Sequence, residues 1–345
     1  MRRRTTAARS RAPLAALLTT FELLASVFLI ACHTLSTEAP GALVPPTADQ
    51  DPSLPRLLVR VAGRDRMLHL QTFGDPANPP LFVVPGGPGA DFRLLLPLRA
   101  LADRYHVVMW DPRGAGLSER VTEAELTRDS FDDEIAAVHA TLAPGRPVAL
   151  VGHSEGAALV LRYAARHADA VAFVGLIEPA PITANARRHY HGGFPSFDAV
   201  EDFFWQNELL TSSDHAAADY KALTLVPNAS AGFTCNGRPP PDDPMWRFGA
   251  FHHHVLTHGA AAPTGDFSWA DGIDAYRGPL VLLAGSCGDA GASFQRAYNL
   301  PAIPRADVRV IEGAGHISLF IDYANATVDV LRTVLPAYGA GGRGQ

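Results

Sequence analysis

Short apolar runs recur along the chain and alternate with segments of helical periodicity. The apolar runs cover residues 81–84, 106–110, 148–151, 171–177, 280–284 and 308–311. Helical patterns lie around residues 94–104, 130–142 and 157–164, and Ser130 begins a capping box that opens the second of them. Strands that are apolar on both faces and separated by helices form parallel sheets covered on both sides. The pattern therefore predicts an α/β fold with a doubly wound, mostly parallel sheet.

Two segments lie outside this alternation. Residues 57–61 and 67–72 flank a turn at Gly63 and predict a hairpin that opens the domain. About a hundred residues between 177 and 280 fit no strand and helix alternation, yet they are rich in aromatic residues. We expect a largely helical cap at 182–278, inserted over the carboxyl edge of the sheet, where ligands bind in such folds. The core is then 56–181 and 279–338, with a flexible tail at 339–345.

Residues 1–32 have the order of an export signal. Arginines at positions 2, 3, 4, 9 and 11 precede apolar stretches that end in Leu29-Ile30-Ala31-Cys32. This end resembles the lipobox of bacterial lipoprotein signals, which implies cleavage before Cys32 and a lipid on its thiol. Residues 33–55 are rich in proline without an apolar period, and predict a tether. The expected location is the cell envelope, anchored to a membrane.

Glu22 lies within the apolar part of this signal. A charged residue at the centre of a helix costs about 3 kcal/mol on insertion into a membrane. An uncleaved single N-terminal anchor and a misassigned start codon are therefore kept as alternatives to the lipoprotein.

Composition bounds the class of protein. The 345 residues are 47% hydrophobic and 19% charged, which suffices for a sizeable core. The formal net charge of −6 provides no basic footprint, so nucleic acid is not an expected partner.

The segment at residues 148–158 predicts a reactive serine. It reads Val-Ala-Leu-Val-Gly-His-Ser-Glu-Gly-Ala-Ala, an apolar strand that enters a helix through G-x-S-x-G. Gly152 and Gly156 permit a turn so tight that Ser154 takes strained backbone angles and its hydroxyl projects. The same five-residue pattern occurs in unrelated turns, so the strand before it and the helical pattern after it carry the prediction of a nucleophile.

Acyl transfer at a serine also needs a base and an acid that orients the base. His316 follows the last predicted strand among small residues, and the chain order serine, acid, histidine suits this fold. Asp289, in the loop after residues 280–284, is the favoured acid. Glu178, directly after residues 171–177, is the alternative, and its carboxylate could instead bind the amino group of a substrate.

Backbone N–H groups must stabilise the oxyanion of the tetrahedral intermediate. We expect one from Glu155, directly after the serine, and a second from Gly86 or Gly87, in the loop after the strand at 81–84. The turn at residues 111–118 is interpreted as structural, with Arg113 holding neighbouring loops by hydrogen bonds.

The histidines and cysteines admit other readings. The run of histidines at 252–254 and His258 lack the spacing of a tetrahedral metal site, so no metal or other cofactor is expected. Cys235 and Cys287 remain after Cys32. In an exported protein they form either a disulfide between cap and core or two separate buried thiols.

Four motifs in order resemble the alpha/beta-hydrolases and, within them, the proline iminopeptidase group. They are Pro85-Gly86-Gly87-Pro88-Gly89, Asp111-Pro112-Arg113-Gly114-Ala115-Gly116-Leu117-Ser118, the turn at Ser154, and Gly313-Ala314-Gly315-His316. The resemblance covers the chain from roughly residue 57 to 335. It implies an alpha/beta-hydrolase fold and a serine hydrolase acting on a short peptide or other small molecule.

Three functions follow from these expectations. The first is an aminopeptidase resembling proline iminopeptidases, in which Glu178 or acidic cap residues bind the substrate's free amine. The cap candidates are Glu201, Asp202 and Glu208. The second is a carboxylesterase or amide hydrolase with an apolar cap pocket. The third is a catalytically silent binding module, against which the presence of all the triad residue types argues.

The lipobox-like end generates a first testable prediction. Cys32→Ser removes the thiol that would carry the lipid, so the protein should leave the membrane fraction or accumulate as an unprocessed precursor. Fractionation and metabolic labelling with a fatty acid measure this. An unchanged, lipid-labelled mature form would contradict the lipoprotein interpretation.

Overall fold

The computed structural model describes residues 44–190, 205–206, 214–223, 235, 245–259 and 262–335. The chain divides into two units, Met1–Ala39 and Pro40–Gln345. The first unit lies outside the described residues, and so do Cys32 and the tail at 339–345. Across the described ranges, no helix has the length and apolar character needed to cross a membrane.

An eight-stranded sheet forms the centre of the described part of the chain, in the order β1-β2-β4-β3-β5-β6-β7-β8. The strands are β1 (Arg56–Val61), β2 (Arg64–Phe73), β3 (Pro80–Val84), β4 (His106–Trp110), β5 (Val148–His153), β6 (Val171–Ile177), β7 (Leu280–Gly285) and β8 (Asp307–Ile311). The pairs β1·β2 and β2·β4 are antiparallel and the others are parallel. The predicted fold class and the predicted hairpin are both confirmed.

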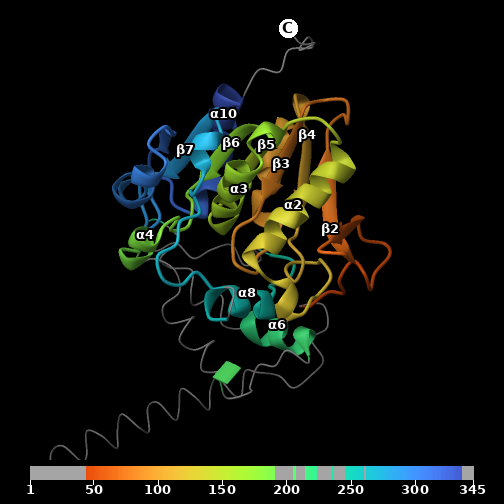
Figure 1. The fold of residues 1–345 in the computed structure, drawn as a ribbon. Helices are drawn as coiled ribbons and strands as arrows, with labels where there is room; N and C mark the ends of the chain where they lie inside the picture. Colours follow the sequence, from red (N-terminus) through yellow and green to blue (C-terminus); the bar gives the residue numbers. More distant parts are fainter. Residues whose placement is uncertain are drawn as a thin grey trace, which may run out of the picture. The chain divides into compact units, whose positions relative to one another are not determined.

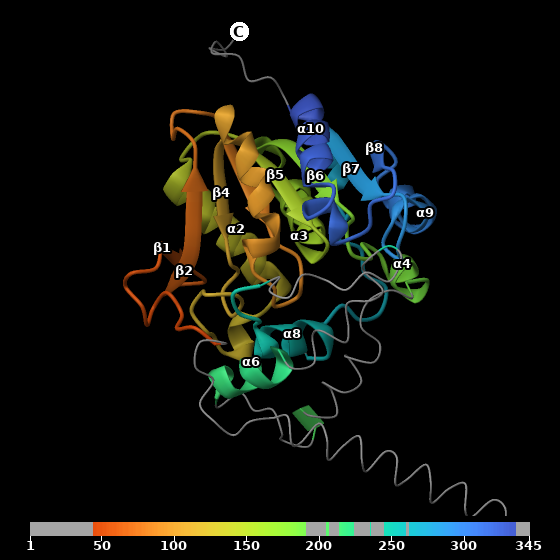
Figure 2. The ribbon, with the colours of Figure 1, turned by 180° about the vertical axis from the view of Figure 1, so that it is seen from behind.

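Helices cover both faces of the sheet, as Figures 1 and 2 show. One face carries α2 (Arg128–Leu142) and α3 (Glu155–Arg166), and the other carries η2 (Phe92–Asp103) and α10 (Ala324–Val334). Neighbouring strand residues belong to opposite cores: Phe82 packs on the side of α2 and α3, and Val83 on the side of η2. Every residue of β3, β4, β5 and β7 is therefore buried, which explains their continuous apolar sequence.

The shorter elements connect these layers. They are η3 (Glu123–Glu125), η4 (Ala168–Ala170), η7 (Ile273–Ala275), α9 (Ala292–Phe294), η8 (Gln295–Asn299), η9 (Leu300–Ala302) and η10 (Ser318–Phe320). The start of α2 differs from the prediction. Thr127 is the N-cap and Ser130 is its partner at the third helical position, so the capping box begins three residues earlier than expected.

The segment before β1 is not a free tether as far as residue 55. Thr47 and Ala48 are buried, and the Ala48 N–H donates to the Leu117 carbonyl at 2.7 Å. The Arg247 guanidinium donates to the Pro45 carbonyl at 2.8 Å. These contacts attach the chain to the domain from Val44 onward, because its backbone groups find partners there.

The described part of the insertion contains three short α-helices. Its helices are α4 (Ala184–Arg188), α6 (His215–Leu223) and α8 (Ala250–Thr257). Asp219 of α6 is buried, and its carboxylate accepts hydrogen bonds from Arg120 Nε at 3.1 Å and from the Ala250 N–H at 2.9 Å. The Gly249 N–H donates to the Gly89 carbonyl at 2.8 Å. The beginning of α8 is thus fixed against the loop after β3, below the sheet in Figure 1.

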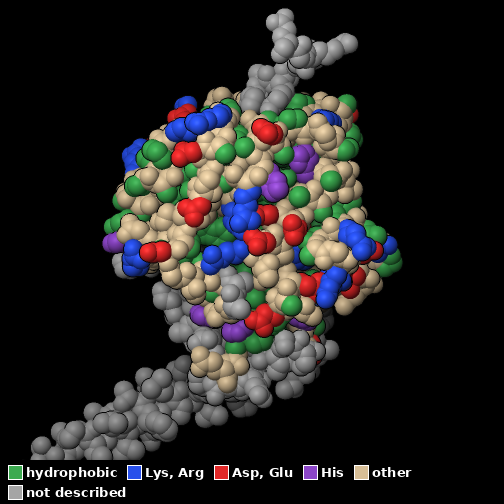
Figure 3. Space-filling model, viewed as in Figure 1, with side chains coloured by type: hydrophobic (Ala, Val, Ile, Leu, Met, Phe, Trp, Pro, Cys, Tyr) green, Lys and Arg blue, Asp and Glu red, His purple; other side chains and the backbone are tan. Residues whose placement is uncertain are grey.

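Charges of both signs are interspersed on the face shown in Figure 3, over α2 and α3. Arg162 and Arg166 of α3 pair with Asp132 of α2 at 3.1 Å in each case. Burial raises the pKa of Asp132 to about 6, although both arginines oppose the rise. A face of mixed sign agrees with the lack of a basic footprint in the sequence.

One buried arginine holds the turn after β4. Arg113 is 1% exposed and donates to the carbonyls of Glu125 and Ser130, each at 2.9 Å. Its guanidinium also lies 3.4 Å from the Glu134 carboxylate. Burial raises the pKa of Glu134, and Arg113 opposes that rise. The expected structural role of Arg113 is confirmed.

This arrangement generates a stability prediction. Arg113→Ala should lower the free energy of unfolding by about 3–5 kcal/mol, because it leaves the buried Glu134 charge without its partner. Arg309→Ala is the matched control: it pairs with Asp307 at 2.6 Å, both side chains are about half exposed, and such pairs contribute less than about 1 kcal/mol. Denaturant unfolding measures both, and equal losses would contradict the assignment.

Candidate active site

The turn between β5 and α3 has the strained geometry expected of a nucleophile. Ser154 has φ 54° and ψ −119°, in a region that non-glycine residues rarely occupy. Its N–H donates to the Ile177 carbonyl of β6 at 3.0 Å. A Cβ on Gly152 would collide with the Gly156 carbonyl oxygen, and a Cβ on Gly156 with the carbonyl oxygens of residues 84 and 85, so neither position has room for a side chain. Ser154 therefore begins α3 in a fixed orientation.

The loop after β3 passes directly over this turn. A Cβ on Gly86 would lie 2.7 Å from Ser154 Cβ and 2.9 Å from the His153 carbonyl oxygen, closer than real Cβ atoms come. A Cβ on Gly87 would lie 3.6 Å from Glu155 Oε2. The structure thus brings the three residues expected to donate N–H groups, Gly86, Gly87 and Glu155, to Ser154.

Glu178 is the carboxylate that contacts the histidine. His316 Nδ1 lies 2.7 Å from Glu178 Oε2, and the other oxygen, Oε1, accepts a hydrogen bond from the Gly285 N–H at 2.7 Å. Glu178 is fully buried. Its φ is 40°, so like Ser154 it is one of the described non-glycine residues with positive φ. Both oxygens are engaged, so the carboxylate is held in one orientation toward His316.

The preference for Asp289 as the acid is corrected. Its side chain is exposed in the loop after β7. That loop runs alongside the loop after β8 that carries His316, here called the histidine loop. The Ser286 N–H donates to the Ile311 carbonyl at 3.0 Å, and the Cys287 N–H donates to the Ala314 carbonyl at 3.1 Å. The turn at Gly288, with φ 87°, then leads to Asp289 at the surface. An acid directly behind a seven-residue apolar strand was the sequence signal for Glu178.

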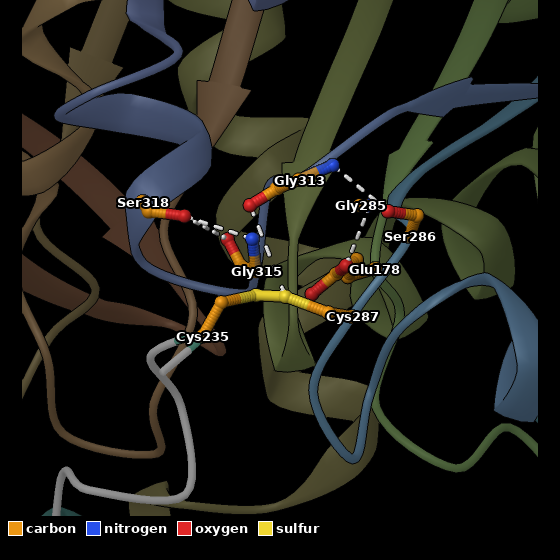
Figure 4. Close-up of a disulfide and its surroundings, with 8 residues drawn as sticks. All are labelled: Glu178, Cys235, Gly285, Ser286, Cys287, Gly313, Gly315 and Ser318. Atoms are coloured by element: carbon orange, nitrogen blue, oxygen red, sulfur yellow. Dashed lines mark hydrogen bonds between the residues drawn. A yellow bond between two sulfur atoms is a disulfide. The ribbon is translucent and has the colours of Figure 1, made fainter. Parts of the chain in front are cut away.

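Cys235 and Cys287 form a disulfide between the insertion and the loop after β7, with 6.0 Å between their Cα atoms. Figure 4 shows it beside Glu178 and the histidine loop. Ser286 Oγ accepts the Gly313 N–H at 2.8 Å, which joins the two loops a second time. The end of β7, whose Gly285 N–H donates to Glu178, and the loop that carries His316 are therefore joined to each other.

His153, which the sequence did not single out, packs against His316. Their ring centroids are 4.3 Å apart, and the Phe320 ring meets His153 edge-on at 4.8 Å. Burial, together with His316, lowers the pKa of His153 well below its usual value. His153 is thus a neutral neighbour that supports the ring of His316 without adding positive charge beside it.

The consecutive histidines of α8 have separate surroundings. His252 Nδ1 lies 2.9 Å from the Arg113 carbonyl, and burial lowers the pKa of His252 to about 3. The His254 ring stacks on Trp205 at 4.6 Å. The described ranges contain no group of three or more residues that could hold a metal ion.

Four acidic residues were predicted to bind the amino group of a substrate. Glu178 is engaged by His316 and Gly285. Glu201, Asp202 and Glu208 lie outside the described residues.

Residues 79–323 match the family model of the alpha/beta hydrolase fold, and the chain belongs to this family. It is similar to a proline iminopeptidase of Thermoplasma volcanium, with 28% identity over 180 residues, 46% of this chain and 61% of the relative. A proline iminopeptidase of Heyndrickxia coagulans is 38% identical over 85 residues, 24% of this chain and 29% of the relative. The chain therefore matches 61% or less of the length of these relatives.

Solved structures share the fold at low identity. Proline iminopeptidase of Mycobacterium smegmatis is 19% identical with a TM-score of 0.54, covering 81% of this chain and 98% of that chain. An esterase from Thermogutta terrifontis has the same TM-score, identity and coverage. The expected family resemblance is confirmed, while peptidase and esterase neighbours fit the fold equally well.

The site generates a prediction about the acid. Glu178→Gln should lower kcat by about 10⁴, because an amide can hold the imidazole in the wrong tautomer and cannot stabilise the imidazolium. Asp289→Asn, the matched control, should retain wild-type turnover. Hydrolysis of a nitrophenyl ester measures both variants, and thermal unfolding checks their fold. An inactive Asp289→Asn beside a normal Glu178→Gln would return the role to Asp289.

Proposed function

We propose that this alpha/beta hydrolase is a serine hydrolase that forms an acyl-enzyme on Ser154. The observation that carries the proposal is the 2.7 Å contact of His316 Nδ1 with the buried Glu178, at the same sheet edge as the strained Ser154. A serine, a histidine and a carboxylate in this chain order and fold are the parts that acyl transfer requires.

Acylation follows from the orientation of His316. Its Nδ1–H donates to Glu178, which leaves Nε2 to take the proton of Ser154 as the hydroxyl attacks the substrate carbonyl. Glu178 then stabilises the imidazolium, because the Gly285 N–H holds its carboxylate in place beside His316. The Glu155 N–H and an N–H of Gly86 or Gly87 receive the oxyanion.

The imidazolium of His316 completes acylation by giving its proton to the leaving group, which departs and leaves the acyl group on Ser154. Deacylation repeats these steps with water as the nucleophile. A water molecule then gives a proton to His316 as it attacks the ester, and Ser154 recovers its hydrogen. This sequence needs no cofactor.

An aminopeptidase resembling proline iminopeptidase is our first substrate assignment, supported by the two iminopeptidase relatives. Both oxygens of the Glu178 carboxylate already have partners, His316 and Gly285, so the substrate's amine would have to bind elsewhere. The cap acids Glu201, Asp202 and Glu208 stay candidates. A carboxylesterase is the second assignment, favoured by that engagement of Glu178. Attachment to the cell envelope through Cys32 also stays a proposal.

Ser154→Ala tests the mechanism. It should abolish labelling by a fluorophosphonate probe and lower turnover by about 10⁴ or more. Activity on aminoacyl-naphthylamides beside nitrophenyl esters then separates the two substrate assignments. Ser118→Ala is a control, since this buried serine donates to the Asp111 carbonyl at 2.6 Å and should keep the label on Ser154. Full labelling of Ser154→Ala would refute the nucleophile.

A further inference from the structure

Glu155 places a carboxyl oxygen next to Gly87, one of the two glycines expected to donate an N–H to the oxyanion. Its backbone N–H begins α3 beside Ser154, and its Oε2 lies 3.6 Å from the position of a Cβ on Gly87. The side chain is only partly exposed, and its carboxyl accepts no hydrogen bond from any residue in the described ranges. One residue therefore provides both an expected oxyanion donor and, close to Gly87, an acid whose charge no described hydrogen bond stabilises.

These two features oppose each other when the carboxyl is ionised. The oxyanion gathers negative charge in the transition state, and a carboxylate next to the donor loop raises the energy of that charge. Two negative charges in one partly buried site repel each other, which raises the energy of the transition state and lowers the rate. A protonated carboxyl carries no such penalty.

The surroundings of Glu155 favour the protonated form of its carboxyl up to near neutral pH. Burial raises the pKa of Glu155 to about 7, and His253 of α8 opposes the rise. Other described titratable groups on the elements around this loop include His153, His316, Asp91 and, on α8, His252 and His254. Burial lowers the pKa of His153 and raises the pKa of Asp91, each well away from its usual value.

His253 is held beside the same loop. It is 5% exposed, and its Cβ lies 3.2 Å from the position of a Cβ on Gly89. Its N–H donates to the Gly249 carbonyl at 2.9 Å, and Gly249 in turn donates to the Gly89 carbonyl. The cap helix therefore carries the one histidine that acts electrostatically on Glu155 among the described residues.

We propose that Glu155 is a proton-controlled positioning residue of the oxyanion hole: the hydrolase is fast while this carboxyl is protonated and slows when it ionises. The inference rests on the proposed acyl-enzyme at Ser154. It adds an alkaline limb to the pH profile that the serine, histidine and Glu178 would not produce by themselves, because a neutral His316 is the active base.

The test is the pH dependence of kcat/KM on p-nitrophenyl acetate, a substrate without an ionisable group in the acyl part, between pH 5 and pH 9. Wild-type kcat/KM should fall by about tenfold or more with a midpoint near pH 7, because a tenfold change needs only about 1.4 kcal/mol of charge repulsion. Glu155→Gln keeps the shape and removes the charge, so its profile should lose that fall. Glu312→Gln, an exposed acid on the histidine loop, is the control and should keep it.

His253→Gln provides a second readout if Glu155→Gln fails to fold. Without His253 the carboxyl holds its proton more tightly, so the midpoint should move to higher pH. A fall that persists unchanged in Glu155→Gln, or an unmoved midpoint in His253→Gln, overturns the inference. Ester hydrolysis that survives in Ser154→Ala would instead refute the proposed function, so the two failures are distinguishable.

Discussion

Level strand ends are the constraint on which the candidate site depends. Register pairs His153 with Ile177 and Ile177 with Leu283, so β5, β6 and β7 finish side by side. The next residue of β5 is Ser154, and the next residue of β6 is Glu178. The N–H of each donates to the last part of the neighbouring strand, at 3.0 Å and 2.8 Å. The sheet therefore places both residues before any side chain makes a contact.

The remaining parts of the site are loops held to that edge. The loop after β3 can lie on Ser154 because Gly86 has no side chain, and the start of α8 is bonded to the same loop at Gly89. On the other side, the loop after β7 is joined to the histidine loop by backbone hydrogen bonds and to the insertion by the Cys235–Cys287 disulfide. The described insertion is thus linked to the loop after β3 and, through Cys287, to the loop that carries His316.

Burial gives the acids of this edge different roles. Each carboxylate oxygen of Glu178 has a partner, the Gly285 N–H or His316 Nδ1, so this group is held in one orientation. Glu155 lacks such donors, and burial raises its pKa to about 7. The two glutamates therefore differ in hydrogen bonding: donors fix Glu178, whereas Glu155 lacks them and burial favours its protonated form.

Local patterns in the sequence determined the α/β class, the strands, the hairpin and the strained turn at Ser154, because apolar periodicity and glycine spacing act over a few residues. They did not decide the acid. The contact between Glu178 and His316 joins residues 138 positions apart, and it depends on strand register and on where the loop after β7 turns. The N-cap at Thr127 and the packing of Thr47 and Ala48 likewise depended on tertiary contacts. Only the folded sheet brings such distant groups within hydrogen-bond distance.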